Sequence, residues 1–176
     1  RQVDLQKEEI SVRMSYPDPS KDRVGFNPII YPDLDMSYTL KVVPQGKSFR
    51  IIVDLDEPLP DEWVGKVGMN IELFPGILFG KSYYMDDEFG IFNLQPNGPG
   101  FYTEEGEYRL EPMATGKKLT IVPEDPKQTL SIRNTNNSEL VLLDGRAISS
   151  NGWFIFPSLV HALYNKGSRD WIVTPN

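Results

Sequence analysis

Acidic side chains are the residues of this chain whose chemistry could support catalysis. Hydrolysis of a glycosidic bond uses two carboxyl groups held about 5 Å or about 6.5–9.5 Å apart. Five carboxylates fall in or beside one predicted loop: Asp86, Asp87, Glu88, Glu104 and Glu105. Adjacent residues of a strand point to opposite sides, so the closeness of Asp86 and Asp87 in sequence does not supply this geometry. A solvated acidic rim, or a calcium site of carboxylate and carbonyl oxygens, explains the cluster as well.

Other catalytic groups find little support in the sequence. His161 is the only histidine, and no Gly-x-Ser-x-Gly sequence accompanies it, so we interpret it as a structural imidazole among apolar neighbours. A single histidine excludes histidine-rich metal sites, and the absence of cysteine excludes disulfides, thiolate metal sites and cysteine nucleophiles. We therefore predict no catalytic residue and no cofactor, and leave a structural calcium ion open as an alternative.

Aromatic residues suggest a binding function instead. The C–H face of a sugar ring stacks on an aromatic plane, and sugar hydroxyls need planar polar partners. Trp63 has acidic and glycine neighbours and is expected to be exposed, whereas Trp153 and Trp171 lie in apolar strands and are expected in the core. The predicted sugar-binding residues are Trp63, Arg50, Asn70, Glu72, Tyr84, Asp86 and Tyr102.

Period-two alternation predicts the strands that must position these residues. Residues 9–15 alternate, and residues 36–43 and 49–55 form an antiparallel hairpin around the turn 44–47. We expect residues 67–73 to add a third strand to that hairpin, so that Arg50, Asn70 and Glu72 would share its polar side with Tyr84 and Asp86. Further strands are predicted at residues 83–86, 118–122, 129–133, 139–143, 152–159 and 170–174, with a single helical turn at 159–164.

These elements predict an all-β fold in one domain. Fifteen prolines and fourteen glycines interrupt helices and supply turns, and 176 residues suffice for one core. The expected architecture is a two-sheet antiparallel β-sandwich of jelly-roll or immunoglobulin-like type over residues 1–176, with a closed barrel as the alternative. We expect a loose N-terminal arm at residues 1–8 and long loops at 16–35 and 94–113.

Charge and hydropathy exclude two classes of partner. The formal net charge is −7, and basic residues occur singly or in pairs, so nucleic acid is a poor partner. No run of about 18 apolar residues is present, so we predict no membrane-spanning helix. Because the chain begins at Arg1, we expect a mature protein or a piece of a longer one.

Two stretches carry a resemblance to a known family. They are residues 69–76 with 80–86, Phe92 and 95–99, and residues 142–146 with 151–154 and 171–176. Residues 69–176 resemble the N-terminal β-sandwich module of multimodular bacterial glycoside hydrolases, in which such an ending leads towards a family nine, endoglucanase-type catalytic barrel. The resemblance implies an accessory module, and no catalytic residue of that family is present to be carried over.

The leading hypothesis is thus a non-catalytic carbohydrate-binding module. We expect a monomer, secreted or at the bacterial cell surface, that binds a β-glucan-type plant polysaccharide and is linked to a glycoside hydrolase catalytic domain. One alternative is a small glycanase or polysaccharide lyase that uses Asp86, Glu88, Glu104 or Glu105. The other is a structural module that packs on a catalytic domain and leaves an apolar patch exposed when alone.

Overall fold

The computed structural model describes residues 1–16, 34–63, 70–74, 76–96, 101–106, 108–109, 111–135, 139–147, 153–157 and 167–175. In these ranges strands dominate, and the helical elements are two 3₁₀ turns, η1 (Asp61–Trp63) and η2 (Gly145–Ala147). No helix in this part of the chain has the length and apolarity needed to cross a membrane. The predicted all-β fold is confirmed.

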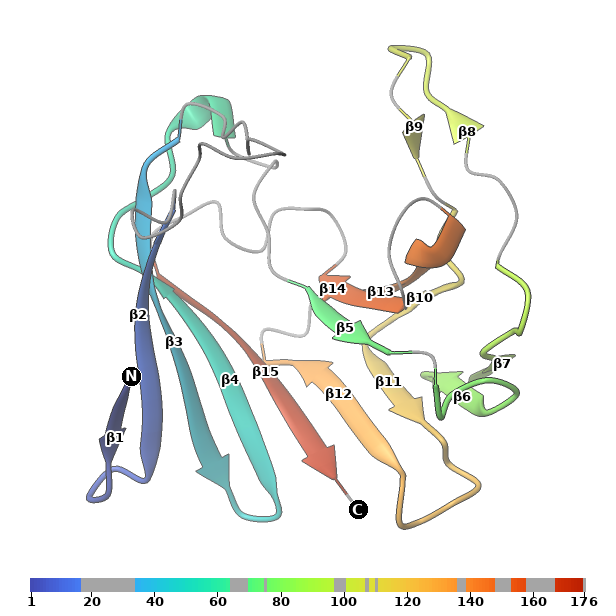
Figure 1. The fold of residues 1–176 in the computed structure, drawn as a ribbon, viewed down its shortest axis with the longest axis horizontal. Coiled ribbons are helices and arrows are strands. Elements are labelled where there is room, and N and C mark those ends of the chain that lie inside the picture. Colours follow the sequence, from blue (N-terminus) through green and yellow to red (C-terminus); the bar gives the residue numbers. More distant parts are fainter. Residues whose placement is uncertain are drawn as a thin grey trace, which may run out of the picture.

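A nine-stranded antiparallel sheet forms the larger layer (Figure 1). Its order is β1-β2-β3-β4-β15-β12-β11-β6-β7. The strands are β1 (Gln2–Asp4), β2 (Glu9–Tyr16), β3 (Met36–Gln45), β4 (Ser48–Leu55), β6 (Ser82–Met85), β7 (Glu88–Ile91), β11 (Lys118–Ile121), β12 (Leu130–Asn134) and β15 (Gly167–Pro175). The C-terminal strand thus lies in the middle of the sheet, and β7 forms one of its edges.

Two smaller sheets complete the fold. The four-stranded sheet has the order β10-β13-β14-β5, with β5 at Ile71–Leu73, β10 at Ala114–Gly116, β13 at Leu140–Asp144 and β14 at Trp153–Pro157. The third sheet is the hairpin of β8 (Phe101–Tyr102) and β9 (Tyr108–Arg109). In Figure 1 this hairpin stands at the top right, apart from β6 and β7 at the lower right.

The core lies between the nine-stranded and four-stranded sheets. The larger sheet contributes the fully buried Val53, Met85, Leu119 and Ile132, and the smaller contributes Leu140, Leu142, Trp153 and Ile155. Each such side chain stabilises the fold by about 1.5–3 kcal/mol relative to exposure. The four-stranded sheet does not extend over β1 to β3 (Figure 1), and Ile10 and Met14 of β2 are each 43% exposed.

Most predicted strands are confirmed, including the β3–β4 hairpin, whose turn contains Gly46 with a φ of 61°. The prediction that residues 67–73 extend this hairpin is wrong. The strand is Ile71–Leu73, and it pairs with β14 of the other sheet. The edge of β4 that it was expected to occupy is taken by β15, which pairs with β4 from Gly167 to Val173.

The loops also differ from expectation. The arm at residues 1–8 contains β1, paired with β2, and the carboxylate of Asp4 accepts the N–H groups of Gln6 and Lys7 in the intervening turn. The predicted loop 94–113 contains the β8–β9 hairpin. Within the predicted loop 16–35, Tyr16 ends β2 and Leu34 is buried, whereas residues 17–33 lie outside the described ranges. The helical turn at 159–164, with His161, also lies outside them.

Candidate functional site

One face of the nine-stranded sheet points away from the core, and we call it the outer face. Neighbouring residues of a strand alternate between faces, and cross-strand partners share one. Met85, Leu119 and Ile132 are partners in register and are buried against the four-stranded sheet. Their neighbours Tyr84, Thr120 and Ser131 therefore project from the outer face.

Two aromatic rings lie at the β7 edge of the outer face. Tyr84 of β6 is directly opposite Phe89 of β7, and their ring centroids are 5.7 Å apart in an edge-to-face arrangement. Tyr84 is 38% exposed and Phe89 is 61% exposed. Burial does not explain two large rings in this position, so they form a platform on which an apolar ligand face can stack.

The opposite side of the same hairpin holds the platform in place. The ring of Tyr83 is buried beneath Gly90, where an added Cβ would lie 2.1 Å from the Tyr83 Cζ. Tyr83 also packs against the buried Phe92, with ring centroids 5.1 Å apart. Burial, and secondarily the charge of Glu88, raise the pKa of the Tyr83 phenol above its usual value, so the ring stays neutral.

Asp86 ties the hairpin to β11. It is the first residue of the two-residue β6–β7 turn and has a φ of 52°. Its carboxylate accepts the backbone N–H groups of Lys117 and Lys118 at 2.9–3.1 Å, and its own N–H donates to the Lys118 carbonyl at 2.8 Å. Gly116 leaves room for this carboxylate, since an added Cβ would lie 2.6 Å from the Asp86 Oδ2. Asp86 therefore has a structural role beside the platform.

Hydroxyl groups continue the row that the rings begin. Thr120 of β11 is the cross-strand partner of Tyr84 on one side and of Ser131 of β12 on the other. The two hydroxyls are hydrogen-bonded to each other at 3.1 Å and are partly exposed. Since neighbouring strands are about 4.8 Å apart, the row Phe89, Tyr84, Thr120 and Ser131 covers about 14 Å across the strands.

Two cations lie beside this row. Lys118 and Arg133 are cross-strand partners on β11 and β12, and both are exposed. They lie two residues from Thr120 and Ser131 on the same strands, so their side chains also project from the outer face. We call the set of Tyr84, Phe89, Thr120, Ser131, Lys118 and Arg133 the outer-face site. It combines rings, hydroxyls and positive charge on four adjacent strands.

The sugar-binding residues predicted from the sequence lie in several separate parts of the fold. Tyr84 and Asp86 lie in or beside the outer-face site. Arg50 is half-buried on β4, and four strand spacings, about 19 Å, separate β4 from β6. Asp54 of the same strand pairs with Lys41 at 3.1 Å. The part of the face near Arg50 is thus distinct from the aromatic edge.

The other predicted residues lie on different surfaces. Glu72 of β5 is exposed, as is Asn70, which precedes this strand. Because the neighbouring Ile71 and Leu73 pack against the core, the Glu72 side chain points away from the core, on the outside of the four-stranded sheet. That is the opposite side of the sandwich from Tyr84, which corrects the expectation of one shared polar side. Trp63 in η1 is half-buried and packs on the core, which corrects the expectation that it is exposed. Tyr102, 73% exposed, lies on the separate β8 hairpin.

The acidic residues considered for catalysis are also separated. Asp86, Asp87 and Glu88 lie in the β6–β7 hairpin, whereas Glu104 and Glu105 lie in the β8–β9 hairpin, at the other end of that side of Figure 1. Within the described ranges, no group of three or more His, Asp or Glu residues is placed to hold a metal ion. The acidic residues thus fall into two separate groups, one in each hairpin.

Comparison with known proteins adds little to this geometry. No protein-family model matches the sequence, and no curated protein matches it. Among solved structures, the protein Slr1438 from Synechocystis sp. PCC 6803 aligns with a TM-score of 0.42 and 13% sequence identity. The alignment covers 100% of this chain and 65% of that protein, so the chain spans less than two thirds of its length.

Proposed function

We propose that this domain is a non-catalytic carbohydrate-binding module whose ligand stacks on Tyr84 and Phe89. The observation that carries the proposal is the exposure of these two rings in register with the hydroxyls of Thr120 and Ser131. A sugar ring has an apolar C–H face for an aromatic plane and hydroxyls for polar partners at its edge. The row offers both kinds of contact side by side.

The arrangement of the site over four adjacent strands favours a polymer as ligand. The row crosses four strands and ends at β7, which is the edge strand of this sheet among the described strands, so a chain longer than the row can extend past it. As a partner polypeptide we propose a glycoside hydrolase catalytic domain linked to this module in a secreted or cell-surface bacterial enzyme. This part rests on the resemblance of residues 69–176. Linkage would raise the local concentration of substrate at the active site.

Isothermal titration against a panel of soluble polysaccharides, with β-glucans included, tests the binding function. We expect dissociation constants in the range of about 1 μM to 1 mM, because few rings stack and hydroxyl desolvation offsets much of the gain. Phe89→Ala and Tyr84→Ala should each weaken binding about fivefold or more. Heats that stay flat for the whole panel would exclude carbohydrate binding.

Phe74→Ala is the matched control. Phe74 is 68% exposed, follows β5 of the other sheet, and is not part of the outer-face site. Its replacement removes an exposed ring of the same kind from another surface. Equal losses for Phe74→Ala and Phe89→Ala would show that exposed rings bind the polymer without a defined site.

A structural module is the second candidate function, and a second surface supports it. Phe74, Ile77, Phe79 and Leu94 are between 40% and 72% exposed, and the Arg146 guanidinium lies 5.4 Å from the Phe79 ring and bonds the Leu94 carbonyl. Exposed apolar side chains of this number often mark a contact surface. Two results together would favour this candidate. A hydrophobic dye should fluoresce strongly with the intact domain and less with the double variant Ile77→Ser, Leu94→Ser, and the glycan titrations should stay flat.

A further inference from the structure

The like charges of Lys118 and Arg133 are unusual in a sheet. Directly opposite residues in an antiparallel pair have Cβ atoms about 4.5–5.5 Å apart, and like charges at such positions destabilise the pair. Neither side chain forms an ion pair with any described residue. The sheet therefore keeps two repelling cations beside the aromatic platform.

Two other cations on the same face are neutralised. The Arg13 guanidinium pairs with the Asp56 carboxylate, and the Lys41 ammonium pairs with Asp54 at 3.1 Å. Both basic residues share the outer face with Lys118 and Arg133, as the register of β2, β3 and β4 shows. The absence of a carboxylate partner is thus specific to the β11–β12 pair among these described cations.

The nearest acidic residue does not replace such a partner. Asp86 lies beside Lys118, but its carboxylate is bonded to the backbone N–H groups of Lys117 and Lys118. Asp87 and Glu88 lie in the same hairpin, on the β6 side of β11. These three carboxylates therefore border the cation pair on its β6 side.

We propose that the outer-face site binds an acidic polysaccharide, and that Lys118 and Arg133 together hold the carboxylate of a uronic acid unit. The proposal rests on the proposed carbohydrate-binding function and names its ligand class. An arginine guanidinium matches the planar carboxylate, and a lysine ammonium on the facing strand adds a second charge-assisted contact. One sugar unit stacks on Tyr84 and Phe89, and the hydroxyls of Thr120 and Ser131 lie beside the rings across the strands and beside the cations along β11 and β12.

Paired polymers that differ only in charge test this inference. Polygalacturonate and its fully methyl-esterified form have the same backbone, and titration in the presence of EDTA removes any contribution from bridging calcium. We expect the intact domain to bind polygalacturonate about tenfold more tightly at low salt, and this preference to shrink as salt screens the contacts. Lys118→Gln with Arg133→Gln should abolish the preference.

Two further variants make the result specific. Lys41→Gln removes a cation of the same face outside the site and should change either affinity less than twofold. Phe89→Ala should weaken both polymers alike, since stacking does not depend on the carboxylate. An intact domain that binds both polymers equally, or a double variant that keeps the preference, overturns the inference and leaves carbohydrate binding standing. No binding to either polymer or to β-glucans overturns the proposed function itself.

Discussion

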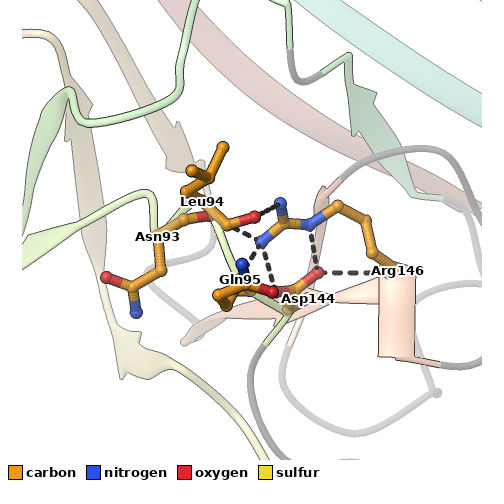
Figure 2. A network of polar contacts seen from close by, with 5 residues as sticks. All are labelled: Asn93, Leu94, Gln95, Asp144 and Arg146. Atoms are coloured by element: carbon orange, nitrogen blue, oxygen red, sulfur yellow. Dashed lines mark hydrogen bonds and ion pairs between the residues drawn. The ribbon is translucent and has the colours of Figure 1, made fainter.

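The guanidinium of Arg146 and the carboxylate of Asp144 form a two-point ion pair inside the domain (Figure 2). The Arg146 Nε donates to Oδ1 at 2.8 Å and Nη2 donates to Oδ2 at 2.7 Å, and Asp144 is 2% exposed. Arg146 also donates to the carbonyls of Asn93 and Leu94, and its guanidinium lies 4.2 Å from the Trp153 ring. It thereby fixes the segment that follows β7 to the four-stranded sheet.

Arg146→Met should therefore be strongly destabilising. The variant leaves the buried Asp144 carboxylate without its charged partner, and breaking a buried pair in this way costs about 3–5 kcal/mol. Urea unfolding followed by tryptophan fluorescence measures the loss. Adding Asp144→Leu should recover part of it, because no unpaired charge then remains. A single variant within about 1 kcal/mol of the parent would contradict this account of the pair.

Gly90→Ala should disturb the platform from below. The added Cβ would overlap the buried Tyr83 ring, so either the ring or the edge strand must shift, at a cost of about 1–3 kcal/mol. Because β6 is the only described strand that pairs with β7, the shift should also move Phe89 and weaken glycan binding. Gly76→Ala is the control, since an added Cβ there meets nothing within 4 Å. Unfolding curves of both variants measure the change in stability, and titrations measure the change in glycan affinity.

Alkaline pH should weaken the fold through Tyr83. Its folded-state pKa is raised above the ordinary value of 10.0 by burial and by Glu88, so folding favours the neutral phenol. This contribution is fully present below about pH 10 and is lost as the pH rises through the folded-state pKa. The unfolding free energy should therefore fall as the pH rises above about 10, and less so in Tyr83→Phe. Burial of Tyr38 acts in the same direction, so Tyr83→Phe should remove only part of the slope.

Local sequence patterns were sufficient to predict most strands, because alternation depends only on one segment and its two faces. The β3–β4 hairpin is an example, since its turn and both alternating runs are contiguous. Pairing between distant segments could not be predicted in this way. The β4–β15 pairing brings residues near positions 50 and 170 together, and a period of two identifies neither partner. Alternation alone therefore places β5 in the wrong sheet.

The same limit applies to the site. Tyr84 could be predicted because an exposed tyrosine in an alternating strand is visible in the sequence, whereas Phe89 was one of many aromatics near loops. Lys118 and Arg133 become neighbours only through the register of β11 and β12, and Thr120 and Ser131 meet through the same register. A one-residue slip between β11 and β12 would place the two side chains of one strand on the other face. Side chains that are ordinary along the chain thus become a site only when the strands pair.

A final prediction distinguishes the effect of the Lys118–Arg133 pair on stability from its effect on ligand binding. Arg133→Glu replaces a like-charge cross-strand pair by an opposite-charge pair with Lys118, which should raise the unfolding free energy by about 0.5 kcal/mol at low salt. The same substitution places a carboxylate where we propose that the ligand carboxylate binds, so affinity for polygalacturonate should fall more than in Arg133→Gln. Thermal unfolding and titration of the two variants at low and at high salt measure both effects. If the repulsion between Lys118 and Arg133 is retained because it serves binding, the variant that loses ligand affinity should gain stability. Loss of stability in Arg133→Glu would instead show that the arginine supports the fold.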